Sequence, residues 1–182
     1  MRILTLLLLL SWSTTAEELT MIDKHQLEAD VIIPVLLYLA PDIPYSKAAV
    51  ELLLGTATVE SNRGDYIRQL GGGPALGIYQ MEPATYSDIY DNYLRYNKHL
   101  MEKIEALRSP SSLGGEKSQL IGNLFYATAL ARVHYKRVPK SLPLEGDLEG
   151  MANYWKDYYN THLGAGTIAH YMEKNDGRIH RD

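Results

Sequence analysis

Glu60 is the residue whose surroundings in the sequence best suit acid–base chemistry. The apolar residues before it follow the spacing of a helix with one buried face: Val50, Leu53, Leu54, Ala57 and Thr58. Burial against such side chains disfavours the charged form of a carboxyl and raises its pKa, which suits a general acid near neutral pH. We interpret Glu60 as a candidate acid, with an ordinary solvated glutamate at a helix end as the alternative.

The other reactive residues form weaker patterns. Ser61 follows Glu60 directly but is not part of a Gly-x-Ser-x-Gly motif, so we interpret it as a residue that orients the acid or the substrate. The glycines at 71–73 precede Pro74, whereas a phosphate-binding loop continues with Gly-Lys-Ser/Thr. The histidines show neither an HExxH motif nor a close pairing: His25, His99, His134, His162, His170 and His180. The sequence therefore predicts no metal and no cofactor.

Helices on both sides of the glycine-rich loop must position these residues. Ser46 is suited to cap the helix that delivers Glu60, and Pro83 suits the first turn of the next helix. A first helix is expected to begin near Asp23 and to be kinked or divided by Pro34. Further helices are expected at 98–107, 120–138 and 150–160, with a last one ending near 175. No alternating strand pattern is longer than a few residues, so the sequence predicts a mainly α fold in a single domain.

A combination of short motifs follows Glu60. Glu60-Ser61 is followed seventeen residues later by Gly-Ile-Tyr-Gln at 77–80 and then by Pro-Ala-Thr at 83–85. This combination resembles the catalytic core of the soluble lytic transglycosylases and goose-type lysozymes. In that family a Glu-Ser pair ends a helix, a Gly-Leu-Met-Gln-like turn lines the glycan cleft, and a Pro-x-Thr helix start follows. Ile78 and Tyr79 replace the Leu and Met here. The resemblance implies a lysozyme-like domain with a catalytic cleft.

A third motif lies near the end of the chain. Tyr159-Asn160, followed by glycines at 164 and 166, resembles the family's Ala-Tyr-Asn-Ala-Gly-like string, in which a Tyr hydroxyl lies near the catalytic Glu. Tyr158 stands where Ala is usual, so either Tyr158 or Tyr159 takes that role. Asn123 is a polar residue inside an apolar helical pattern and needs hydrogen-bond partners, so it either caps a neighbouring backbone or reaches the cleft. The family also has an Asn in a comparable long helix. The resemblance covers about residues 46 to 167.

The activity implied by this resemblance is that of a peptidoglycan lytic transglycosylase, which cleaves the β-1,4 bond between N-acetylmuramic acid and N-acetylglucosamine. The compact single-domain design also fits a phage-type member of the family. Glu60 would act first as acid and then as base, because the substrate's own 6-hydroxyl replaces a second carboxylate. The implied substrate-binding residues are Ser61, Gly77, Tyr79, Gln80, Asn123, Tyr159 and Asn160. The implied partner is a peptidoglycan glycan strand, and no cofactor is implied.

Two other functions stay open at this point. A lysozyme-type muramidase hydrolyses the same bond and usually needs a second carboxylate. The nearby candidates for it are Asp65, Glu82, Asp88 and Asp91. A non-catalytic glycan-binding or virion structural protein would keep the same scaffold but would have no need of a half-buried acid at Glu60.

The first sixteen residues have the pattern of an export signal. Arg2 precedes an apolar run from Ile3 to Leu10, and Ala16 suits the last position before cleavage. We therefore expect a signal peptide at 1–16, a domain at 17–182, and export to the periplasm or the extracellular space. The run is about half of the roughly twenty residues that a membrane-spanning helix needs, so no permanent anchor is expected. An amphipathic or disordered extension is the alternative.

Composition limits the partners further. The net charge is −4, and no basic run indicates a nucleic-acid partner. The chain has no cysteine, so its stability must come from its core and not from disulfides. A chain of 182 residues, 46% of them hydrophobic, is sufficient for such a core. The sequence leaves the oligomeric state open.

Overall fold

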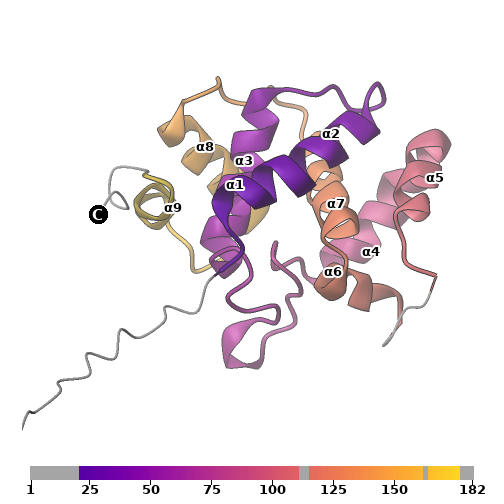
Figure 1. Cartoon of the computed structure of the whole chain (residues 1–182), viewed down its shortest axis with the longest axis horizontal. Coiled ribbons are helices and arrows are strands. Elements are labelled where there is room, and N and C mark those ends of the chain that lie inside the picture. Colours follow the sequence, from indigo (N-terminus) through magenta and orange to yellow (C-terminus); the bar gives the residue numbers. More distant parts are fainter. Residues whose placement is uncertain (1–20, 111–114, 162–163, 177–182) are drawn as a thin grey trace, which may run out of the picture.

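The computed structural model describes residues 21–110, 115–161 and 164–176 (Figure 1). These residues form helices, turns and two isolated bridges, without a β-strand among them. The prediction of a mainly α fold is therefore confirmed. The predicted signal peptide at 1–16 lies outside the described residues. No helix in the described part of the chain is long and apolar enough to cross a membrane.

Helix α3, Lys47–Ser61, runs through the middle of the fold and ends at the candidate acid (Figure 1). Ser46 caps it as predicted, because the Ser46 hydroxyl accepts a hydrogen bond from the Ala49 amide over 3.1 Å. Most of its side chains from position 49 to 58 are buried. Asn62 closes the helix in the left-handed conformation. The chain therefore turns sharply immediately after Glu60-Ser61.

The first helical stretch begins where it was predicted. The Asp23 carboxylate accepts from the Gln26 amide and caps α1, Lys24–Gln26. A π-helical segment, Leu27–Ile32, then leads into α2, Ile33–Leu39. Pro34 lies in the first turn of α2, where its missing N–H costs least. The wider π-helical turn before it is the irregularity that Pro34 was expected to produce.

Helices α4, Pro83–Asn92, and α5, Lys98–Ala106, confirm two further predicted starts. By contrast, the single helix predicted at 120–138 is wrong, because the chain forms α6, Gln119–Gly122, and α7, Leu124–Lys136. Asn123 separates them with an extended backbone, and its side-chain oxygen accepts from the Tyr126 amide as the cap of α7.

Three helical segments complete the fold: α8, Leu148–Trp155, a π-helical segment, Lys156–Asn160, and α9, Ile168–Asn175. The buried side chains form two cores. The first core lies among α3, α8 and α9, and the second lies among α4, α5 and α6. Helices α2 and α7 contribute to both cores (Figure 1). The loop at 75–81 also contributes side chains to both cores, so it lies where the two meet.

Candidate active site

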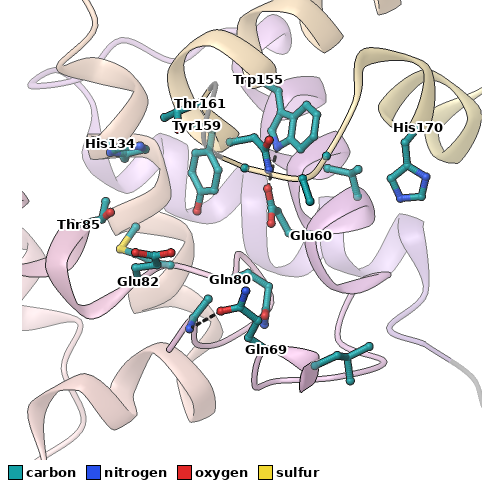
Figure 2. A pocket seen from close by; sticks show the side chains of 18 of the residues that line it. Glu60, Gln69, Gln80, Glu82, Thr85, His134, Trp155, Tyr159, Thr161 and His170 are labelled. Carbon is teal, nitrogen blue, oxygen red and sulfur yellow. Dashed lines mark hydrogen bonds between the residues drawn. The ribbon is translucent and has the colours of Figure 1, made fainter. Parts of the chain in front are cut away.

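A cleft of about 600 Å³ opens where the two cores meet (Figure 2). One wall comes from the end of α3, the end of α8 and residues 159–161, 164–166 and 170. The other wall comes from the loop at 66–82, the start of α4 and one residue of α7. This volume lies in the range of cavities that bind small molecules. Glu60 lies on the first of these walls (Figure 2).

The Glu60 carboxyl is partly buried and has one side-chain hydrogen-bond partner among the described residues. The indole Nε1–H of Trp155 donates to Glu60 Oε1 over 2.8 Å (Figure 2). Burial raises the pKa of Glu60 from 4.5 to about 7, although the hydrogen bond from Trp155 acts in the opposite direction. Both protonation states are therefore well populated near neutral pH, as general acid–base catalysis requires.

The Trp155 indole is fixed by close packing on two sides. Its ring lies 5.3 Å from the ring of Tyr171, which belongs to α9. A side chain added at Gly166 would come within 2.5 Å of Trp155 Cη2, so only glycine lets the loop pass over the indole. The Gly166 of the third sequence motif therefore acts on Glu60 indirectly, through the tryptophan.

Ser61 does not line the cleft. Its hydroxyl is buried, lies 2.7 Å from the Ile78 carbonyl oxygen and accepts a hydrogen bond from the Gly64 amide over 3.0 Å. This residue was predicted to orient the acid or the substrate. In the structure, its hydrogen bond to Ile78 links the end of α3 to the loop at 77–80.

Gly77 and Gln80 shape that loop. Gly77 has a φ of 73°, and a Cβ there would lie 1.9 Å from the Leu120 carbonyl oxygen of α6. Gln80 lines the cleft, and its amide Nε2 donates to the Gly77 carbonyl over 2.7 Å. The remaining amide oxygen of Gln80 is thus the atom best placed to contact a ligand.

Tyr79 and Asn123 are not lining residues of the cleft, which corrects the substrate-binding role predicted for them; for Asn123 the alternative, a cap on the backbone, is the one that the structure shows. The Tyr79 ring is buried in the first core, where its hydroxyl accepts from the Thr128 hydroxyl over 3.2 Å. The Asn123 side chain caps α7 and donates to the Leu107 carbonyl over 2.8 Å. Their polar atoms satisfy the protein's own buried groups.

Between the two candidate tyrosines, Tyr159 is the one that lines the cleft (Figure 2). Its hydroxyl donates to the main-chain oxygen of Tyr79 over 2.8 Å. Tyr158 instead packs beside the Tyr154 ring, with 4.7 Å between the ring centroids. Asn160 also lines the cleft and accepts from Lys156 Nζ through its side-chain oxygen.

Three further lining residues bear on the chemistry of the cleft, and of these only Glu82 had been named from the sequence as a site candidate, one of four for a second carboxylate. Trp155 contacts Glu60 across 95 positions of sequence, and its place in a short aromatic helix was the only available signal. His134 lies near Tyr159, with the two rings edge to face at 5.0 Å. Burial lowers the pKa of His134 to about 4, and its Nδ1 pairs with Arg137, so the ring is neutral at pH 7. Glu82 is the third.

Glu82 is the second carboxylate of the cleft. It is exposed and lies apart from Glu60 across the opening (Figure 2). Asp65, another predicted candidate, is exposed and is not a lining residue. Within the part of the chain that the structure describes, no three His, Asp or Glu side chains gather in a way that would hold a metal ion.

No family model, curated protein or solved structure matches this chain. The functional argument therefore rests on the cleft and its chemistry. Its central observation is a single carboxyl with a pKa near neutrality, held by an indole N–H at the wall of an open cleft.

Proposed function

We propose that the chain is a peptidoglycan lytic transglycosylase in which Glu60 is the catalytic acid and base. The observation that carries this proposal is the raised pKa of Glu60, about 7, at the wall of an open cleft of about 600 Å³. A non-catalytic glycan-binding protein would gain nothing from this carboxyl, because burial of an ionisable group costs stability. The proposal includes export of the enzyme, since its substrate lies outside the cytoplasm.

The proposed reaction needs one carboxyl and no water. Protonated Glu60 donates its proton to the glycosidic oxygen, and the bond from that oxygen to the anomeric carbon of N-acetylmuramic acid breaks. The 6-hydroxyl of the same sugar attacks this carbon, and ionised Glu60 takes the hydroxyl proton. The products are a 1,6-anhydro end and a free 4-hydroxyl, and Glu60 is again protonated.

Trp155 and the cleft-lining amides supply the positioning. The hydrogen bond from Trp155 holds Glu60 Oε1, so the other carboxyl oxygen is the one that carries the transferable proton. Gln80 and Asn160 present amide groups on opposite walls, where they suit the hydroxyl and N-acetyl groups of a sugar. Tyr159 adds an aromatic ring to the lining of the cleft (Figure 2).

Glu82 favours a second candidate function, that of a hydrolytic muramidase. An inverting hydrolase needs a second carboxylate across the cleft to activate a water molecule. Glu82 is a lining residue and is exposed, so its side chain is in contact with water. The two functions differ in the chemistry of the product.

Mass spectrometry of digested peptidoglycan distinguishes these functions. We expect the wild-type protein to release fragments with 1,6-anhydromuramic ends, which are lighter by one water than reducing ends. Reducing ends throughout would contradict the transglycosylase proposal and identify a hydrolase. In that case Glu82→Gln should abolish the activity, whereas under the transglycosylase proposal it should leave the anhydro product unchanged.

Replacing Trp155 by phenylalanine tests how Glu60 is positioned. The ring is kept but the N–H is lost, and this N–H lowers the pKa of Glu60. The pKa should therefore rise in W155F, and the fall of activity with increasing pH should move to higher pH. Measuring the rate from pH 5 to 9 checks this. An unchanged profile with a uniformly lower rate would mean that Trp155 only packs.

A further inference from the structure

Arg132 is a buried cation that the proposed reaction does not use. It lies on α7 and is 6% exposed. Its Nε is buried and has no hydrogen-bond partner among the residues that the structure describes. An unpaired buried donor costs free energy, and an unpaired buried charge costs more. Such a group calls for a compensating partner.

That partner is not an acidic side chain of the described chain. The titratable groups that act on Arg132 there are the phenols of Tyr154 and Tyr93, and burial lowers the pKa of the guanidinium. Two other arginines with small exposed fractions are ion-paired: Arg137 with Asp88, and Arg108 with Glu105. Arg132 has no ion pair among the described residues.

We propose that Arg132 is the base of a binding site for a small oxyanion, a phosphate or a carboxylate. A guanidinium presents parallel N–H donors in a fixed plane, which matches two oxygens of either group. Tyr93 adds a hydroxyl that forms no hydrogen bond with another described residue, so it is available as a further donor. The small exposed fraction of Arg132 admits an ion or the tip of a ligand but not a broad surface.

This site is separate from the cleft. His134 lines the cleft, and Arg132 precedes it by two residues on α7. Two residues correspond to about 200° around an α-helix, so Arg132 lies on nearly the opposite side. The Tyr154 hydroxyl near Arg132 is already bonded to the Lys140 carbonyl, in the connection after α7. The inference is therefore independent of the proposed function.

Thermal unfolding in matched salts tests the site. We expect phosphate to raise the wild-type midpoint by about 2–4 °C over chloride at the same ionic strength and pH, since an ion that binds the folded chain stabilises it. R132M should lose this shift, and R95M, which removes an exposed arginine, should keep it. In chloride alone R132M should be at least as stable as the wild type, because it removes an uncompensated charge.

A parallel measurement in acetate distinguishes a phosphate from a carboxylate as the ligand. A higher unfolding midpoint in acetate as well as in phosphate would mean that the site accepts a carboxylate. An equal shift in the wild type and R132M, or no shift in the wild type with either ion, would overturn the proposal. If R132M does not fold, the NMR signal of the Arg132 Nε–H group in the wild type gives the answer. It should move on addition of phosphate, and a signal that stays fixed would count against the site.

Discussion

Replacing Glu60 by glutamine is expected to lower peptidoglycan digestion by at least about 10²–10⁴-fold, the range that general acid–base catalysis contributes. Glutamine has nearly the same shape and still offers an oxygen to the Trp155 N–H, but it has no proton to transfer. Turnover of purified peptidoglycan measures the effect. Binding of glycan fragments should survive, because the walls of the cleft are unchanged. Full activity in E60Q would overturn both enzyme functions.

The stability of E60Q as a function of pH tests whether the pKa of Glu60 is raised in the folded chain. In the folded chain the pKa of Glu60 is about 7, against 4.5 for a free glutamate, so the folded state holds this proton more tightly. The stabilisation linked to that proton is complete below pH 4.5 and is lost as the pH rises through about 7. Relative to the wild type, E60Q should therefore gain thermal stability between pH 5 and pH 8. A relative loss over this range would contradict the raised pKa.

Replacing Gly77 by alanine is expected to be the most damaging change in the loop at 77–80. The φ of 73° costs an alanine about 1–2 kcal/mol, and the new Cβ would lie 1.9 Å from the Leu120 carbonyl oxygen. We expect the free energy of unfolding to fall by more than about 2 kcal/mol. Activity should fall with it, because Gln80 would move away from the cleft. Chemical denaturation measures the first effect.

Gly72 provides the matched control for this change. Its φ is 83°, but nothing lies within 4 Å of a Cβ placed on it. Gly72→Ala should therefore report the backbone strain alone, and the difference between the two variants measures the contact with α6. Equal losses in both variants would mean that the approach of Gly77 to Leu120 is not tight in solution.

Those parts of the fold that depend on near neighbours could be predicted from the sequence. Asp23 and Ser46 cap helices through amides only three residues away, and Pro83 suits a helix start by its own geometry. The helix break at Asn123 could not be predicted in this way. Helical spacing continues on both sides of it, and its side chain is drawn to the Leu107 carbonyl of a distant segment.

In the candidate site, too, the features set by neighbouring residues could be predicted, and those set by distant residues could not. Glu60 was found because burial and helix end are both readable from local spacing. The direction of the Tyr79 ring could not be predicted, because a loop residue points toward whichever core the fold brings near. Here the ring lies in the first core, where the buried Thr128 hydroxyl donates a hydrogen bond to the Tyr79 hydroxyl. Trp155 was missed because its partner lies on another helix, and no local pattern specifies a contact between α3 and α8.

The bond between Trp155 and Glu60 also makes the site optically readable. The chain has two tryptophans, Trp12 and Trp155, and Trp12 lies in the predicted signal peptide. In a protein prepared from residue 17 onward, the indole beside the candidate acid would be the only tryptophan fluorophore. Its emission would then arise within hydrogen-bonding distance of the Glu60 carboxyl, so ionisation of Glu60 and occupation of the cleft could both be followed without an added label.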